Sequence, residues 1–202
     1  MMELFHAAAS PFVRKVMVTL HETGQLDAVK IVPASQTPVS PDAGNTAHNP
    51  LGKIPTLTRP DGPALYDSRV ICRYLDHRGG GKLYPEARLW ETLTLEATAD
   101  GIMDAAVLMV YEHRVRPSEK VFDGWLDGQW AKITRALDAL EGRWMSHLSG
   151  RLDMGQIATA CALGYLDLRH GERNWRAGRD GLAAWEKRFA ERASMTATRA
   201  EL

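Results

Sequence analysis

The stretch Asn49-Pro50-Leu51-Gly52-Lys53-Ile54-Pro55-Thr56-Leu57 decides the fold of this chain. It leads into a short β-type run at residues 54–58, which Pro55 interrupts at its second position. Because proline cannot donate to a sheet ladder, it marks an edge, a bulge or a special turn. A cis Ile54–Pro55 bond would leave the N–H and C=O of Ile54 free to pair with an extended peptide. The alternative is a trans proline that simply opens an edge strand.

The residues before this stretch predict a β-α-β unit. Residues 3–6 form a strand-like run, and Ser10-Pro11 is a strong helix start, with Ser10 as the cap and Pro11 at the first helical position. Apolar residues then recur at helical spacing as far as Leu20, and residues 29–33 form a second strand-like run. The unit therefore predicts a parallel strand pair joined by a crossover helix.

The residues around and after Pro55 predict the rest of a first domain, residues 1–78. Residues 34–50 are expected to form a loop with at most a short helix. A turn-rich segment joins the Pro55 strand to a hairpin partner at residues 64–66, and Asp67-Ser68 opens another helix. The expected order is β-α-β-α-β-β-α.

Beyond the expected linker at residues 79–86, which contains three consecutive glycines, no strand pattern appears. Long helices are expected over residues 86–114 and 119–148, and a last amphipathic helix over 181–193. Asp153 and Gln156 form a capping-box pattern before a segment that is apolar on almost every side, which predicts a buried central helix. The fold class is therefore α/β followed by an all-helical domain at residues 87–202.

The composition of the chain argues against some classes of binding partner. The chain has 202 residues, 45% of them hydrophobic and 25% charged, and a formal net charge of zero. This balance argues against nucleic acid or an anionic membrane as the main partner. Cys72 and Cys161 lie far apart within apolar patterns, so we expect two reduced core cysteines and no metal site. There is no secretory signal and no membrane-spanning run, so we expect a cytoplasmic protein.

Four motifs in this order resemble the cytosolic glutathione transferases, in particular bacterial members with a serine in the catalytic loop. They are Ser10 to Lys15, Asn49 to Pro55, Tyr66-Asp67-Ser68, and the Asp153 capping box that leads into Gly164-Tyr165-Leu166-Asp167. The resemblance covers essentially the whole chain. It implies a thioredoxin-like first domain with a cis proline, glutathione as co-substrate without another cofactor, and a homodimer.

The resemblance also implies a role for Ser10. Its hydroxyl and the N-terminus of the following helix would stabilise the thiolate of glutathione, although Ser10 could equally be a helix cap and nothing more. Residues 3–10 contain no tyrosine, which excludes a tyrosine-activated transferase. They contain no cysteine either, which argues against disulfide chemistry by this loop.

The remaining candidate residues would bind the two substrates. The main chain of Ile54 would pair with glutathione, and Ser68 with the first N–H groups of its helix would hold the γ-glutamyl carboxylate. Asp67 either pairs with the α-ammonium group or only caps the helix. Lys53 either reaches the glycine carboxylate or is a solvated loop charge. The pocket for a small hydrophobic electrophile is predicted to be lined by Phe12, Met103, Val107 and Tyr111.

The charged residues of the helical domain are predicted to interact with ligands, with other residues or with solvent. Asp100 and Asp104 share one helix face, so a ligand amine or an arginine is expected to offset their repulsion, unless both are simply solvated or capped. Asp167 is predicted to hold backbone donors. Arg169, Arg173, Arg176 and Arg179 are predicted to be solvated.

Three functions fit the sequence. The first is transfer of glutathione to small electrophiles. The second is another glutathione-dependent reaction at the same site, such as dehalogenation, isomerisation or peroxide reduction. The third is a binding or regulatory protein without turnover. The loop Ala7-Ala8-Ala9, which is poor in polar groups, is consistent with this interpretation.

Overall fold

A four-stranded mixed sheet forms the N-terminal half of the chain in the computed structural model, which describes residues 1–200. The strands are β1 (Met2–His6), β2 (Val29–Pro33), β3 (Thr56–Arg59) and β4 (Gly62–Leu65). Their order across the sheet is β2-β1-β3-β4, with β1 parallel to β2 and antiparallel to β3. The predicted parallel pair and hairpin are thus confirmed. The predicted start of the third strand is wrong, since β3 begins at Thr56 and Ile54 lies before it.

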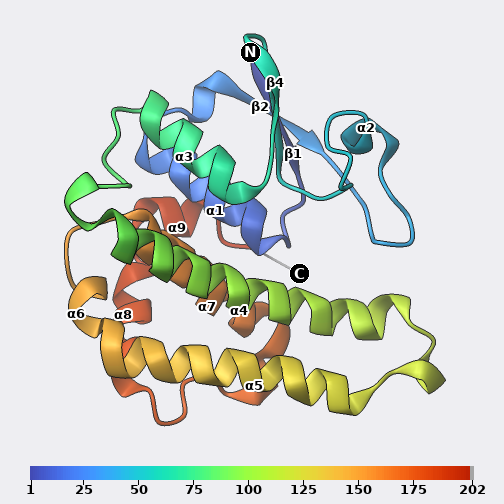
Figure 1. Ribbon diagram of the computed structural model, residues 1–202, viewed down its shortest axis with the longest axis vertical. Helices are drawn as coiled ribbons and strands as arrows, with labels where there is room; N and C mark the ends of the chain where they lie inside the picture. Colours follow the sequence, from blue (N-terminus) through green and yellow to red (C-terminus); the bar gives the residue numbers. More distant parts are fainter. Residues whose placement is uncertain (201–202) are drawn as a thin grey trace.

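Three helices complete this half and confirm the predicted thioredoxin-like order β-α-β-α-β-β-α. They are α1 (Pro11–Glu22), α2 (Ala43–Thr46) and α3 (Ser68–Arg78), with a 3₁₀ turn η1 (Leu26–Ala28) before β2. Helices α1 and α3 pack side by side next to the sheet, whereas the single-turn α2 lies in the loop that leads to Pro55 (Figure 1).

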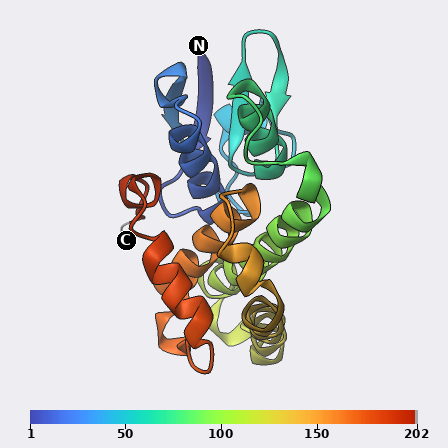
Figure 2. The ribbon, with the colours of Figure 1, turned by 90° about the vertical axis from the view of Figure 1, so that its left-hand side faces the viewer.

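The C-terminal half is all helical within the described residues, as predicted (Figure 2). Its α-helices are α4 (Leu89–Val115), α5 (Asp123–Ala139), α6 (Met145–Leu148), α7 (Met154–His170), α8 (Asp180–Phe189) and α9 (Ala193–Ala197). Short turns connect them: η2 (Glu86–Arg88), η3 (Ser118–Lys120), the π turn η4 (Leu140–Trp144) and η5 (Gly171–Arg173).

Two predicted helices of this half need correction. The helix expected from residue 119 begins at Asp123, because Ser118 opens only the 3₁₀ turn η3. It also passes through the π turn η4 before its last turn at α6. The final helix ends at Phe189, and a separate short helix α9 follows.

Helix α7 is the buried centre of the C-terminal half. Asp153 caps it, and the Gln156 side chain accepts in return from the Asp153 main-chain N–H, which confirms the predicted capping box. Its N-terminal two thirds is buried on all sides, from Met154 to Leu163. Helices α4 and α1 pack against it, so one continuous core joins the two halves of the chain. In the part of the chain that the structure describes, no helix is long and apolar enough to cross a membrane.

Candidate functional site

Ser10 lies at the N-terminus of α1, where its side chain caps the helix as predicted. Its Oγ accepts a hydrogen bond from the main-chain N–H of Val13 at 3.3 Å. A serine hydroxyl also carries one donor hydrogen, and this cap does not use it. Ser10 therefore combines a free hydroxyl hydrogen with the positive end of a helix dipole.

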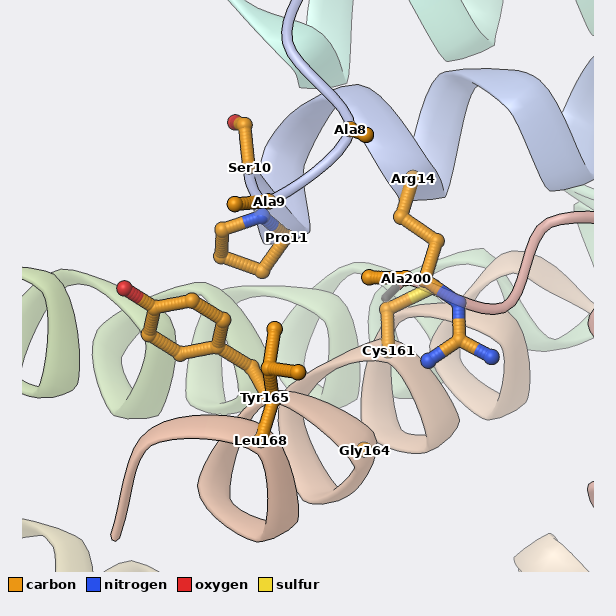
Figure 3. Close-up of a pocket in the computed structure, with 10 residues that line it drawn as sticks. All are labelled: Ala8, Ala9, Ser10, Pro11, Arg14, Cys161, Gly164, Tyr165, Leu168 and Ala200. Carbon is orange, nitrogen blue, oxygen red and sulfur yellow. The ribbon is translucent and has the colours of Figure 1, made fainter. Parts of the chain in front are cut away.

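A small cavity opens beside Ser10, between the start of α1 and helix α7 (Figure 3). Its volume is about 10 Å³, which is room for roughly one water-sized atom. It is lined by residues of both halves: Ala8, Ala9, Ser10, Pro11, Arg14, Cys161, Gly164, Tyr165, Leu168 and Ala200. Tyr165, whose ring lies beside Pro11 with its hydroxyl on the Ser10 side, was missed by the sequence analysis (Figure 3).

The loop before β3 presents an unpaired main chain at Ile54. The Ile54–Pro55 peptide bond is cis, and no main-chain hydrogen bond within residues 1–200 involves Ile54. Buried Asn49 fixes the approach to it, because its Nδ2 donates to the Lys53 carbonyl at 2.9 Å and its Oδ1 accepts from the Leu51 N–H at 3.0 Å. The Lys53 side chain itself is exposed.

Asp67 and Ser68 lie at the start of α3, as predicted. Asp67 caps the helix through the main-chain N–H of Arg69 at 3.0 Å and also pairs with the Arg69 guanidinium at 2.8 Å. Burial alone would raise the pKa of Asp67, but the hydrogen bonds and charge of Arg69 hold it below its ordinary value. Ser68 is buried, whereas the side chain of Asp67 is 52% exposed, so Asp67 presents the charge at the start of α3.

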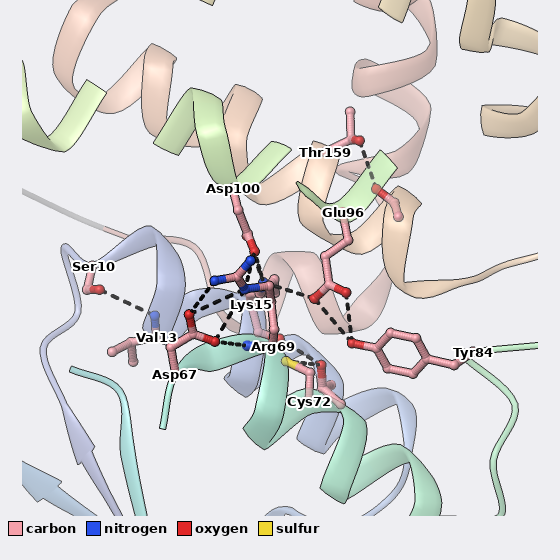
Figure 4. Close-up of polar contacts among 12 residues, drawn as sticks. Ser10, Val13, Lys15, Asp67, Arg69, Cys72, Tyr84, Glu96, Asp100 and Thr159 are labelled. Carbon is pink, nitrogen blue, oxygen red and sulfur yellow. Dashed lines mark hydrogen bonds and ion pairs between the residues drawn. The ribbon is translucent and has the colours of Figure 1, made fainter. Parts of the chain in front are cut away.

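A buried ionic cluster lies beneath these residues, where α1, α3 and α4 meet (Figure 4). The ammonium of Lys15 is fully buried and contacts both carboxylate oxygens of Asp100, at 2.7 and 3.0 Å, and one oxygen of Glu96 at 3.1 Å. The Tyr84 hydroxyl donates to Glu96 on the other side. Arg69 lies 3.6 Å from Asp100 and connects the cluster to Asp67.

The charges in this cluster stabilise one another. Burial alone would lower the pKa of Lys15, but the carboxylates of Asp100 and Glu96 raise it well above its ordinary value. Burial raises the pKa of Glu96, and the Lys15 charge only partly opposes this. The arginine expected near Asp100 is Arg69, at 3.6 Å, but the nearer cation is Lys15, which the sequence analysis did not connect with Asp100. Burial and the neighbouring Asp100 also raise the pKa of Asp104, with Lys53 opposing.

The residues predicted to line the electrophile pocket differ in their exposure. Phe12, Val107 and Tyr111 are half-buried, so each offers some surface to a ligand. Met103 is fully buried in the core and offers none. Cys72 and Cys161 are buried free thiols, as predicted, and burial raises the pKa of Cys161 to about 11. The described residues contain no cluster of side chains suited to hold a metal ion.

Several predictions for the charged residues near the end of α7 are wrong. Asp167 binds side chains rather than backbone donors, accepting from the Trp175 indole at 2.8 Å and pairing with Arg176. Arg179 pairs with Asp138 at 2.6 Å and its side chain is only 11% exposed. Arg173 lies over the ring of Trp130. Because these partners lie in other helices or turns, no local pattern could have indicated them.

The comparisons with known proteins are consistent with this geometry. Models of the glutathione S-transferase N-terminal and C-terminal domains match residues 9–78 and 123–188. An uncharacterized GST-like protein of Escherichia coli K12, YibF, is 33% identical over 98% of both chains. This chain belongs to the glutathione S-transferase family.

Solved structures of the family agree closely with this fold. A glutathione transferase family member from Pseudomonas fluorescens Pf-5 with bound glutathione is 50% identical, with full coverage of both chains and a TM-score of 0.97. A structure of a Pf-5 family member with bound S-(propanoic acid)-glutathione is 49% identical, again with full coverage, and has a TM-score of 0.92.

Proposed function

We propose that this protein is a glutathione transferase in which the Ser10 hydroxyl donates to the sulfur of glutathione and stabilises its thiolate for attack on a small electrophile. The observation that carries the proposal is the state of Ser10. Its oxygen accepts the cap hydrogen bond from Val13, so its hydroxyl hydrogen stays available at the edge of a cavity with room for one atom.

The Ser10 hydroxyl and the N-terminus of α1 can supply the stabilisation that the thiolate requires. A free thiol has a pKa of about 8.5, and lowering it by about two units takes roughly 2.7 kcal/mol. A charge-assisted hydrogen bond contributes about 1.5–3 kcal/mol, and a helix N-terminus contributes about 0.3–1 kcal/mol or more when partly buried. The Ser10 hydroxyl and the start of α1 together therefore suffice.

The rest of the tripeptide would bind along the N-terminal half. The free main chain of Ile54 supports pairing with the cysteinyl residue, as in strand addition. The start of α3 at Ser68 suits the γ-glutamyl carboxylate, and Asp67 its ammonium group. Lys53 would pair with the glycine carboxylate. The glutathione bound in the Pseudomonas relative supports glutathione as the ligand of the present chain.

The proposal extends to the second substrate and to assembly. We assign the electrophile pocket to Phe12, Val107 and Tyr111, and we leave out Met103 because it has no exposed surface. We further propose a cytoplasmic homodimer. The exposed apolar side chains of Val70 on α3 and Trp90 on α4, 47% and 76% exposed, support a protein interface that includes them.

The decisive experiment follows the ionisation of bound glutathione. The ultraviolet absorbance of the thiolate, measured against pH in the complex, should give a thiol pKa about two units below that of free glutathione. Ser10→Ala should shift this pKa back towards the free value and abolish conjugation, while glutathione affinity changes little. A thiol pKa that is the same in wild type and Ser10→Ala would contradict the role of Ser10.

The same measurement separates the competing functions. Glutathione that binds with an unshifted thiol pKa would favour a binding protein without turnover, which the apolar Ala8 and Ala9 side of the cavity also permits. A lowered thiol pKa with no conjugation of common electrophiles would instead favour another glutathione-dependent reaction, such as dehalogenation, isomerisation or peroxide reduction.

A further inference from the structure

Arg169 lies near the Ser10 cavity, one helical turn beyond a residue that lines it. It lies on α7 one helical turn after Tyr165, so the two side chains share a face of the helix. Tyr165 itself lines the cavity together with Ser10 (Figure 3). Four residues of helix rise about 6 Å, which places Arg169 a few bond lengths beyond the cavity wall.

Arg169 is a half-buried cation whose guanidinium lies against the Tyr165 hydroxyl. Its Nε is shielded from solvent and has no hydrogen-bond acceptor. Among residues 1–200, no carboxylate lies within ion-pair distance of its guanidinium, whereas Arg176 and Arg179 near the same end of the chain are both paired. Since a partly buried charge is costly without an anion, this guanidinium is suited to receive one from a ligand.

The surroundings of Arg169 strengthen its preference for an anion. Burial raises the pKa of the Tyr165 phenol to about 12, and the nearby guanidinium groups of Arg169 and Arg114 oppose that rise. At neutral pH the Tyr165 hydroxyl is therefore protonated and can donate. Tyr111 and Arg114 lie on the facing helix α4, and no ion pair within the described residues involves Arg114 either. Two cations, Arg169 and Arg114, therefore lie near the neutral Tyr165 hydroxyl.

We propose that Arg169 and the Tyr165 hydroxyl form an anion subsite in the second-substrate pocket, so that the preferred electrophile carries a carboxylate. This inference rests on the proposed glutathione transferase function and names its substrate class. Because the subsite lies about one helical turn from the cavity wall, the carboxylate should be only a few bonds from the carbon that joins the sulfur. A short unsaturated or halogenated acid has these properties. A large neutral aromatic compound has no carboxylate and would gain nothing from this subsite.

Two glutathione conjugates test the subsite without relying on turnover. The first is S-carboxyethyl glutathione, and the second is its carboxamide analogue, which has the same shape without the charge. Isothermal titration calorimetry should show that the wild-type chain binds the acid roughly tenfold or more tightly than the amide, the effect of one charge-assisted hydrogen bond. Arg169→Met should reduce this preference to about one, and Arg169→Lys should retain part of it.

Matched controls make the result specific. Arg135→Met removes the same charge from an exposed position on α5 and should leave the preference intact. Tyr165→Phe should weaken binding of the acid more than binding of the amide. Thermal unfolding should show that each variant is folded. Equal binding of acid and amide by a wild-type chain that binds glutathione would overturn the subsite alone, as would a preference that survives Arg169→Met. Failure to bind glutathione at all would overturn the proposed function as well.

Discussion

Asn49 shows how one buried side chain supports the proposed glutathione site. It is 1% exposed, and its amide links the Lys53 carbonyl, the Thr56 hydroxyl and the Leu51 N–H. These bonds hold the chain on both sides of Ile54, whose own main chain is left free. The sequence drew attention to Pro55, but the function of Asn49 depends on a loop geometry that no spacing rule describes.

Replacing Asn49 should therefore affect stability and binding together. Asn49→Ala removes three hydrogen bonds and should lower the free energy of unfolding by about 1–3 kcal/mol. It should also weaken glutathione binding, because Lys53 and Ile54 lose their support. Asn49→Asp keeps the acceptor for Leu51 but loses both donors, so its effect should be similar. Urea unfolding and calorimetry measure the two effects, and an Asn49→Ala protein with wild-type stability would refute this role.

Helices α4 and α7 approach each other closely at Gly155. A Cβ atom at this position would lie 2.8 Å from Leu95 Cδ2 and 2.9 Å from Leu95 Cβ. Leu95 is fully buried in the shared core, so it has little room to move. The small residue in the first turn of α7 thus sets the distance between the two main helices of the C-terminal half.

Two glycine substitutions should change the free energy of unfolding in opposite directions. Alanine favours a helix over glycine by about 1 kcal/mol, and Gly101→Ala on α4 should gain up to this amount, since its Cβ would meet nothing within 4 Å. Gly155→Ala should instead destabilise the protein by about 1–3 kcal/mol, because the clash with Leu95 outweighs the propensity. Thermal or urea unfolding of both variants decides the matter, and a stabilised Gly155→Ala protein would contradict the close packing.

Local sequence patterns predicted the elements of this fold but not the contacts between them. The Ser10-Pro11 start, the Asp67 cap and the Asp153 capping box depend on residues within one helical turn, and all three were recognised. The start of α5 was missed because Ser118 forms a cap-like pattern that ends in a 3₁₀ turn. Tyr165 was missed as a cavity residue because its position there depends on α1, which is distant in sequence.

The Lys15 cluster joins the two halves of the molecule, and the sequence analysis did not predict it. Its carboxylate partners lie 81 and 85 residues along the chain, on α4 of the other half. Lys15→Met should lower the free energy of unfolding at neutral pH by about 3–5 kcal/mol, because it leaves Asp100 and Glu96 buried without their cation. Adding Glu96→Gln and Asp100→Asn to this variant should recover much of the loss in urea unfolding. If the triple variant is no more stable than Lys15→Met, unpaired charge is not the cause.

Glu96 should also make the stability of the whole chain depend on pH. Its pKa is raised in the folded state above the ordinary value of 4.5, chiefly by burial, so the folded chain holds the proton more tightly than the unfolded chain. The stabilisation from this proton is therefore complete below about pH 4.5 and is lost as the pH rises through the folded pKa of Glu96. Glu96→Gln, which stays neutral, should lose this decline, so its free energy of unfolding relative to wild type should rise between pH 4.5 and 7. Urea titrations across this range measure the difference, with Glu112→Gln as the control for a buried glutamate outside the cluster. A constant difference between Glu96→Gln and wild type across the range would show that Glu96 is ionised throughout in the folded chain.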